Sequence, residues 1–337
     1  MSSSEVPAGA QAPKVLITAA SLYDVEGPFL RLLREAGFQV VFPPRPAQLT
    51  EEELDQQLGD ARATLAGSEP YTRRVLAGHP ALRVIARCGV GFDAVDVAAA
   101  TDQGIAVATT PGTNHDAVAE HTFALMLALA KRLVPDHNGT RAGRWPRQIT
   151  LPLRGRTLGI AGLGRIGKAV ALRGACFGMR LLAYEPFPDQ EFVSKHGVTL
   201  VPFEGLAAES DYLTLHVPLT PESKYLINKR TLALMKPTAF LINTGRGGLV
   251  CEADLLEALR SRRIAGAGLD VFEEEPAIQN PLFEFDNVVV TPHTAGGDQQ
   301  SRQEMALSAA RAIVALSRGE WPAEQVVNAE VRGRFRW

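Results

Sequence analysis

Short apolar runs alternate with amphipathic stretches along nearly the whole chain. The runs are bounded by Gly, Pro or polar residues, as buried strands are, and the stretches between them have helical spacing. In the first third we expect strands at Val15–Ala19, Gln39–Phe42, Ala63–Ala66, Val84–Arg87 and Ala106–Ala108. Helices are expected at Gly27–Ala36, Thr72–Ala77 and Val95–Gln103. This alternation predicts a parallel sheet with right-handed crossovers.

A second series of strands and helices follows a long apolar helix. That helix is expected at Asp116–Arg132, and an irregular stretch rich in Arg, Gly and Pro runs from Pro135 to Pro152. The later strands are expected at Thr157–Ala161, Arg180–Tyr184, Tyr212–His216, Ala239–Asn243, Ala265–Leu269 and Val288–Thr291, with a last helix at Ser301–Arg318. The sequence therefore predicts an α/β protein with two Rossmann-like, doubly wound domains and a small-molecule active site in the cleft between them.

Length and composition agree with two globular domains. The chain has 337 residues, too many for one compact core, of which 46% are hydrophobic and 21% charged. These proportions exclude a disordered or fibrous chain. The net charge, 35 − 37 = −2, provides no extended positive field, which argues against nucleic acid and anionic membranes as main partners.

Targeting and metal-binding signals are missing from the sequence. Residues 1–12 lack the basic and apolar regions of a signal peptide, and we interpret them as a flexible leader. The apolar stretch Ala117–Ala130 is too short to cross a bilayer. Three scattered cysteines, Cys88, Cys176 and Cys251, have no metal-ligand spacing. They predict buried free thiols in a reducing cytoplasm and no bound metal.

One glycine motif points to a dinucleotide. Gly162, Gly164 and Gly167 follow a strand, open a helical pattern and have the spacing G-x-G-x-x-G. The first glycine allows a tight turn, the second lets the backbone approach a pyrophosphate, and the third lets helix pack on strand. Glu185 ends the next strand, where a carboxylate binds ribose hydroxyls. A purely structural glycine turn is the alternative.

A second glycine loop, Gly89-Val90-Gly91, also follows a strand. No carboxylate ends the strand after it, so it does not match a dinucleotide site. We interpret it as a loop whose backbone N–H groups approach a small anionic ligand. A plain turn is the alternative.

Polar residues after the later strands form a chemical set. Arg246 offers a planar fork for a carboxylate, and His293 can exchange a proton near neutral pH. A carboxylate such as Glu275 or Asp270 behind the ring would orient it and favour imidazolium. Individually, these residues have other interpretations, namely a surface salt bridge, a solvated acidic run or a strand cap. His216 ends a strand and either lines the cofactor site or is merely packed.

In their order and spacing, these motifs resemble the D-isomer-specific 2-hydroxyacid dehydrogenases, which include phosphoglycerate dehydrogenases and glyoxylate/hydroxypyruvate reductases. The resemblance covers about residues 14 to 318 and rests on the glycine motif, NTGRGG, GLDVFEEEP and TPH. It implies that Arg246 binds the substrate carboxylate, Glu275 supports His293, and His293 is the acid/base. The residues implied around NAD are Gly162, Gly164, Arg165, Ile166, Gly167, Glu185, His216, Pro218, Thr244 and Asp270. Gly89, Val90 and Gly91, with Arg246, are implied to bind the substrate.

The resemblance also implies a domain arrangement. A discontinuous substrate domain, residues 13–109 and 298–337, would flank an NAD-binding domain at 110–297, and two chains would form a homodimer. One departure bears on the substrate. Ala66-Gly67 stand where phosphoglycerate dehydrogenases typically carry an Arg that holds the anionic substrate.

The expected activity is hydride transfer between NAD and C2 of a small D-2-hydroxy acid or its 2-oxo acid, of phosphoglycerate, glyoxylate or hydroxypyruvate type. Two alternatives remain open at this point. One is an NAD-sensing binding or corepressor protein of the same fold, and the other is a phosphite-type oxidase.

Overall fold

The computed structural model describes residues 12–145 and 147–337, so the leader expected at residues 1–12 lies almost wholly outside the described residues. The chain divides into two compact units. Unit 1 comprises residues 1–114 and 299–337, and unit 2 comprises residues 115–298. Each unit contains one fully parallel sheet, which confirms the predicted α/β class with two doubly wound domains.

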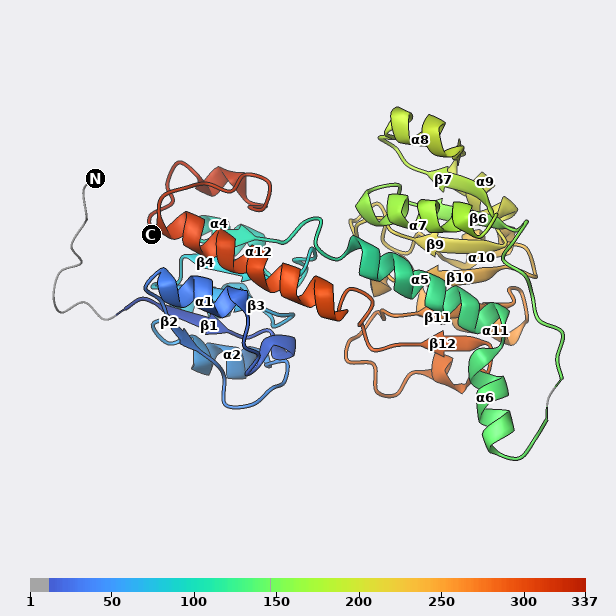
Figure 1. Cartoon of the computed structure of the whole chain (residues 1–337), viewed down its shortest axis with the longest axis horizontal. Coiled ribbons are helices and arrows are strands. Elements are labelled where there is room, and N and C mark those ends of the chain that lie inside the picture. The colour runs from blue at the N-terminus through green and yellow to red at the C-terminus, as the bar shows by residue number, and fades with distance from the viewer. Residues whose placement is uncertain (1–11, 146) are drawn as a thin grey trace. The chain divides into compact units, whose positions relative to one another are not determined.

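Unit 1 is built on a five-stranded sheet in the order β2-β1-β3-β4-β5. The strands are β1 (Lys14–Ile17), β2 (Gln39–Val41), β3 (Ala63–Ala66), β4 (Val84–Arg87) and β5 (Ala106–Ala108). One face packs on α1 (Pro28–Glu35) and α12 (Gln299–Ser317). The other packs on α2 (Glu51–Leu58), α3 (Arg73–Gly78) and α4 (Val97–Asp102) (Figure 1). β3, β4 and β5 are buried along their whole length and are apolar except for Thr64 and Arg87.

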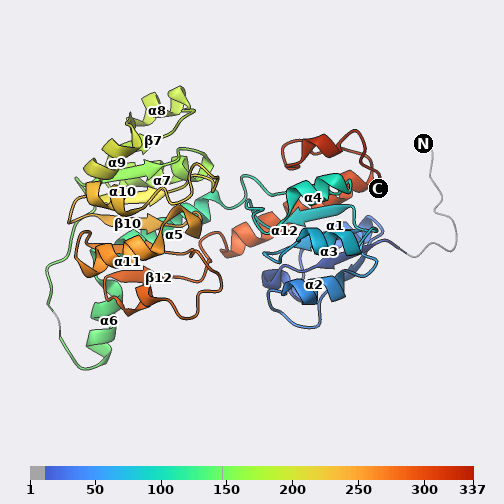
Figure 2. The ribbon, with the colours of Figure 1, turned by 180° about the vertical axis from the view of Figure 1, so that it is seen from behind.

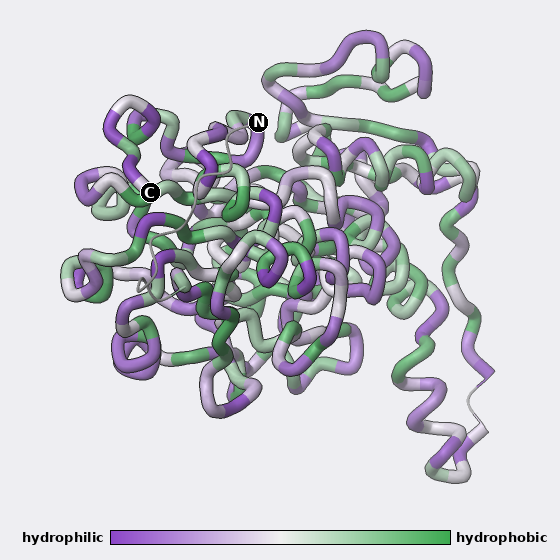
Figure 3. Tube along the Cα trace, turned by 60° about the vertical axis from the view of Figure 1, so that its left-hand side comes forward, coloured by the Kyte–Doolittle hydropathy of each residue, from purple (hydrophilic) through white to green (hydrophobic). Residues whose placement is uncertain are grey.

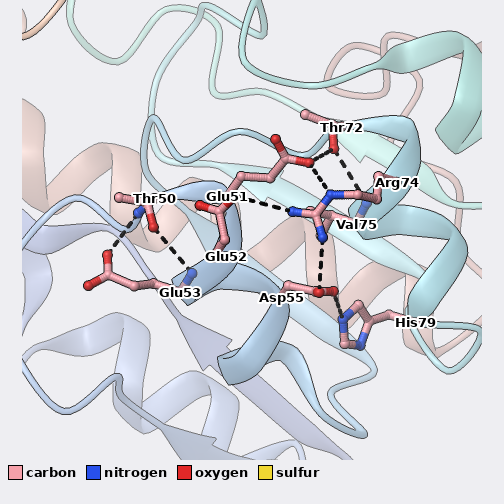
Figure 4. Close-up of polar contacts among 9 residues, drawn as sticks. All are labelled: Thr50, Glu51, Glu52, Glu53, Asp55, Thr72, Arg74, Val75 and His79. Atoms are coloured by element: carbon pink, nitrogen blue, oxygen red, sulfur yellow. Dashed lines mark hydrogen bonds and ion pairs between the residues drawn. The ribbon is translucent and has the colours of Figure 1, made fainter.

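Polar contacts join α2 to α3 on the surface of unit 1 (Figure 4). Thr50 begins α2 with a capping box formed with Glu53. Glu51 accepts hydrogen bonds from the Thr72 hydroxyl at 2.6 Å and Arg74 Nε at 2.8 Å, which hold the pKa of its carboxyl below the usual value. These groups bind one another, so they fix the joint between the two helices.

Unit 2 is built on a seven-stranded sheet in the order β12-β11-β10-β9-β6-β7-β8. Its strands are β6 (Thr157–Ala161), β7 (Arg180–Tyr184), β8 (Thr199–Leu200), β9 (Tyr212–Leu215), β10 (Phe240–Asn243), β11 (Gly266–Leu269) and β12 (Val288–Val290). The helices α5 (His115–Ala130) and α7 (Arg165–Cys176) cover one face. The helices α9 (Phe203–Glu209), α10 (Lys229–Leu234) and α11 (Glu252–Arg260) cover the other (Figure 2). A short helix, α8 (Gln190–His196), precedes the edge strand β8.

Two sequence expectations are wrong. The stretch from Pro135 to Pro152 is not wholly irregular, because α6 (Leu133–Arg141) occupies its first part. Pro135 is the third residue of this helix, where its missing N–H has no intrahelical partner to lose. Cys176 is exposed rather than buried, since it lies in the last turn of α7, while Cys88 and Cys251 are partly buried. Within the described part of the chain, no helix has the length and apolar character needed to cross a membrane.

Candidate active site

The sequence-predicted residues of unit 2 follow the carboxyl ends of its strands. Gly162 follows β6, Glu185 follows β7, His216 follows β9, Thr244 and Arg246 follow β10, Asp270 follows β11, and His293 lies shortly after β12. Because the strands are all parallel, these ends form one edge of the sheet. That edge includes the switch point between β6 and β9, whose following helices, α7 and α10, lie on opposite faces. Ligands of open α/β sheets bind at such a point.

Two of the three glycines of the motif are required by their surroundings, and the third leaves its side of the turn open. A Cβ on Gly162, whose φ is +94°, would lie 2.7 Å from the carbonyl carbon of His216. A Cβ on Gly167 would lie 2.0 Å from the carbonyl oxygen of Gly162, so the start of α7 packs directly on the turn. A Cβ on Gly164 would meet nothing within 4 Å. The open side of this turn, at the N-terminus of α7, is therefore where an anion can approach the backbone.

Glu185 is fixed beside this turn. Its Oε2 accepts a hydrogen bond from the Leu163 N–H at 2.8 Å, and its Oε1 accepts one from the Phe187 N–H at 3.0 Å. These two N–H groups orient the carboxylate, and among the described residues it has no ion-pair partner. The neighbouring cation Lys168 is bound to Asp189, with Nζ 2.6 Å from Oδ2.

His216 presents a neutral ring at the switch point. Its Nε2 lies 2.9 Å from the Thr214 hydroxyl. Burial lowers the pKa of the ring to about 3, so the imidazole is uncharged near neutral pH. In the part of the chain that the structure describes, the buried Nδ1 has no hydrogen-bond partner. An unpaired buried nitrogen costs free energy, so this atom favours a ligand beside it.

His293 and Glu275 form a close pair. The ring Nδ1 lies 2.7 Å from Glu275 Oε2, and Glu275 Oε1 accepts the Phe272 N–H at 3.0 Å. Burial raises the pKa of the Glu275 carboxyl, but the hydrogen bond and charge of His293 outweigh burial and hold that pKa below its usual value. The His293 side chain is 46% exposed, so its Nε2 side can reach a ligand while the carboxylate fixes the ring.

Arg246 lies in a turn fixed by a buried amide. Asn243, the last residue of β10, accepts the Gly245 N–H at 3.1 Å and donates to the Arg246 carbonyl at 2.9 Å. A Cβ on Gly247 would lie 1.8 Å from the Phe272 carbonyl oxygen, so this turn packs against the segment leading to Glu275. The Arg246 charge acts on the Glu275 carboxyl, which places Arg246, Glu275 and His293 in one electrostatic cluster. Sequence reasoning missed Asn243, whose role depends on its position at the strand end.

Asp270 holds the segment that carries His293. It is fully buried and accepts the Thr291 hydroxyl at 2.5 Å, the Thr294 N–H at 2.9 Å and the Ala295 N–H at 2.8 Å. His293, between these residues, has a φ of +53°. Three donors around one carboxylate maintain that unusual backbone conformation. Thr291 also contacts His121 Nε2 of α5 at 2.9 Å.

The second glycine loop lies in unit 1, after β4. Its Gly91 carbonyl accepts a hydrogen bond from Arg87 Nε at 3.0 Å, and the Gly89 N–H donates to the Thr110 hydroxyl at 3.1 Å. Gly89 has a φ of +155°. The Gly89 N–H is therefore used within the unit to shape the loop.

Comparisons with known proteins agree with this geometry. Residues 123–295 match the family model described as "D-isomer specific 2-hydroxyacid dehydrogenase, NAD binding domain". The chain is 40% identical over 329 residues to glyoxylate reductase of Pyrococcus furiosus, covering 95% of this chain and 96% of that protein. It is 40% identical to D-3-phosphoglycerate dehydrogenase of Methanocaldococcus jannaschii over 94% of this chain and 59% of that protein.

A solved structure extends the match to the fold. D-lactate dehydrogenase from Aquifex aeolicus, complexed with NAD and lactic acid, superposes with a TM-score of 0.81 at 28% identity, covering 93% of this chain and 98% of that one. These matches favour an NAD-dependent 2-hydroxyacid oxidoreductase over a binding protein or a phosphite-type oxidase. With NAD as its cofactor and an Arg-Glu-His set at one sheet edge, the chain belongs to the D-isomer-specific 2-hydroxyacid dehydrogenase family.

Proposed function

We propose that the protein reduces glyoxylate or hydroxypyruvate to the corresponding 2-hydroxy acid with NADH. The observation that carries the proposal is the pair formed by His293 and Glu275, 2.7 Å apart and within electrostatic reach of Arg246. The choice of substrate is supported by the full-length similarity to a glyoxylate reductase. It is also supported by the sequence Ala66-Gly67, which has no arginine for a phosphorylated substrate.

Unit 2 has the groups needed to hold the cofactor. Gly162, Gly164, Arg165, Ile166 and Gly167 form the turn and the start of α7, where backbone N–H groups would face the pyrophosphate. Glu185 would accept the ribose hydroxyls, because its carboxylate is already oriented beside the turn. His216, with its unpaired Nδ1, and Pro218, Thr244 and Asp270 would line the nicotinamide side.

The chain's own residues supply binding and proton transfer. Bound NADH supplies the hydride that adds to C2 of the 2-oxo acid. Arg246 binds the substrate carboxylate through two parallel N–H···O bonds. Imidazolium at His293 polarises the 2-oxo group and gives its Nε2 proton to the oxygen as C2 becomes tetrahedral. Glu275 stabilises imidazolium, and Asp270 holds the segment on which the ring is mounted.

In unit 1 we assign an anion-binding role to the loop Gly89, Val90 and Gly91. Since the Gly89 N–H is bound to Thr110, the N–H groups of Val90 and Gly91 are the donors assigned to the substrate. On this basis the segments up to residue 109 and from residue 298 act as the substrate domain, and residues 110–297 act as the NAD-binding domain.

A substrate screen tests the proposed function. NADH oxidation is followed with glyoxylate, hydroxypyruvate, 3-phosphohydroxypyruvate and pyruvate, with chiral analysis of the product. We expect the highest kcat/KM for glyoxylate or hydroxypyruvate, and loss of at least about a hundredfold in His293→Gln, which cannot donate the proton. Preference for the phosphorylated acid, or full activity in His293→Gln, would contradict the proposal.

Glu275→Gln is expected to move the pH profile of reduction. The amide keeps a hydrogen-bond acceptor for His293 but removes the negative charge that favours imidazolium. Because the pKa of Glu275 is depressed, this charge is present throughout the neutral range and is lost only when the pH falls through that lowered value. The alkaline limb of kcat/KM for reduction should therefore shift to lower pH. Glu274→Gln, an exposed neighbour, is the control. Superimposable profiles would show that Glu275 is not coupled to the catalytic proton.

We further propose that the protein is a cytoplasmic homodimer. Its three free cysteines suit a reducing compartment. The segment of α6 projects from the rest of the trace at the lower right of Figure 3. In this segment and shortly after it, the exposed apolar side chains are Leu133, Val134, Trp145 and Ile149, the last at 98%. Such exposed apolar side chains favour burial against a second chain.

Sedimentation of the wild type should give a dimer, and the double variant Trp145→Ser, Ile149→Ser should give a monomer. The control Ile278→Ser, at another exposed apolar position, should remain a dimer. A monomeric wild type would contradict this proposal.

A further inference from the structure

A buried carboxylate lies at the carboxyl edge of the unit 1 sheet. Glu69, in the loop after β3, is 1% exposed. The neighbouring strands β1 and β3 form the switch point of this sheet, because α1 and α3 lie on opposite faces. In open α/β sheets this is the position where ligands bind. The mechanism proposed above uses no residue of this loop.

The loop is folded around the Glu69 side chain. Glu69 Oε2 accepts the hydroxyl of Thr18 at 2.9 Å, and that hydroxyl lies 3.3 Å from the Tyr71 hydroxyl. A Cβ on Gly67 would lie 2.5 Å from Glu69 Oε1, so only glycine at position 67 leaves room for the carboxylate. Burial is the largest influence and raises the pKa of Glu69 above its usual value, although the hydrogen bond from Thr18 and the charge of Arg87 act to lower it. The carboxylate therefore packs against Gly67 and Thr18 at the ends of the strands.

Arg87 connects this carboxylate to the glycine loop. It is the last residue of β4, is 8% exposed and donates from Nε to the Gly91 carbonyl at 3.0 Å. Its positive charge acts on both Glu69 and Tyr71. Ala66 lies opposite Arg87 in the register of β3 and β4, so the loop that carries Glu69 and the Gly89–Gly91 loop follow neighbouring strand ends.

We propose that Glu69 is a specificity-determining residue that excludes substrates with a second anionic group. The inference rests on the proposed function, in which the Gly89–Gly91 loop receives the substrate. An ionised Glu69 offsets the charge of Arg87, so an anionic tail that approaches this edge of the sheet is repelled by the carboxylate as well as attracted by the guanidinium. Electrostatic interactions between groups shielded from water are strong, so one such charge decides between neutral and anionic tails. The enzyme accordingly takes small 2-oxo acids with neutral tails.

Matched substrate pairs test the proposal. In each pair the tails differ in charge: 2-oxobutyrate against oxaloacetate, and hydroxypyruvate against 3-phosphohydroxypyruvate. We expect the wild type to prefer the neutral member at least about tenfold in kcat/KM. In Glu69→Gln, which keeps an oxygen to accept from Thr18, this preference should fall at least about tenfold through a lower KM for the anionic member. Activity on glyoxylate, which has no tail, should stay within about threefold. Glu52→Gln, which removes an exposed carboxylate of the same unit, should change none of these ratios.

Each outcome has one interpretation. An unchanged preference in folded Glu69→Gln, or equal use of both members by the wild type, overturns the proposal. If Glu69→Gln does not fold, Glu69→Asp, which retains the charge, must keep the wild-type preference, and the wild-type ratios still decide. Failure of the proposed function is a separate result, because the wild type would then reduce neither glyoxylate nor hydroxypyruvate with NADH.

Discussion

We expect kcat/KM measured with NADH to exceed kcat/KM measured with NADPH by at least about a hundredfold. Both oxygens of Glu185 are held by backbone N–H groups, so the carboxylate cannot easily turn away from a ribose beside it. A 2′-phosphate would meet this negative charge, and Lys168, the cation nearby, is paired with Asp189. Like charges in a poorly solvated site cost several kcal/mol, which corresponds to about a hundredfold or more.

Steady-state kinetics with the two cofactors measure this preference directly. Glu185→Gln should reduce the preference for NADH over NADPH, mainly by lowering KM for NADPH, because the variant removes the charge and keeps the side-chain shape. Glu191→Gln, an exposed carboxylate of α8 in the same unit, should leave the ratio unchanged. Comparable efficiency of wild type with NADH and NADPH would show that Glu185 does not face the 2′ position.

Arg246→Lys is expected to lower kcat/KM at least about tenfold although the charge is kept. Lysine is a point donor and cannot form the two parallel bonds that fix a carboxylate in a plane. A carboxylate held less firmly also leaves C2 misplaced for hydride transfer, so kcat should fall together with affinity.

The structural role of Arg246 can be separated from the catalytic one. Its Nη1 bonds the Gly245 carbonyl at 2.7 Å, a contact that lysine can partly replace. The thermal unfolding midpoint of Arg246→Lys should therefore remain close to that of the wild type. Arg260→Lys, at an exposed position at the end of α11, is the matched control. Wild-type kinetics in Arg246→Lys would assign this residue a purely structural role.

Strands and their glycine turns were predictable because their signals are local. β3, β4, β6 and β7 coincide with expected runs, since strands buried on both faces are largely apolar. Candidate site residues could also be selected, because carboxyl ends of parallel strands share an edge. The helix α6 was missed because proline in a first turn is compatible with a helix, and composition alone does not distinguish that position from a helix-breaking one.

Contacts between distant residues were not predictable in the same way. Asp270 was selected as a cofactor contact, yet its carboxylate binds the segment of Thr291, Thr294 and Ala295 that carries His293. The contact of His121 with Thr291 joins residues 170 positions apart. Such pairs are set by how α5 and β12 pack, which no local pattern encodes.

By itself, the sequence determined the α/β class, the glycine turn after β6 and the residue types at the strand ends, because backbone sterics and burial impose these over a few neighbouring positions. The resemblance implied that Glu275 supports His293, and the tertiary structure shows the contact itself, what fixes Arg246 and where Glu69 is buried. Glu275 and Asp270 are both carboxylates of the same short segment, and the residues alone do not distinguish their partners. In the folded chain Glu275 contacts the His293 ring, whereas Asp270 accepts hydrogen bonds from one hydroxyl and two backbone N–H groups. The partners differ because hydrogen bonds depend on distance and direction in space rather than on separation along the chain.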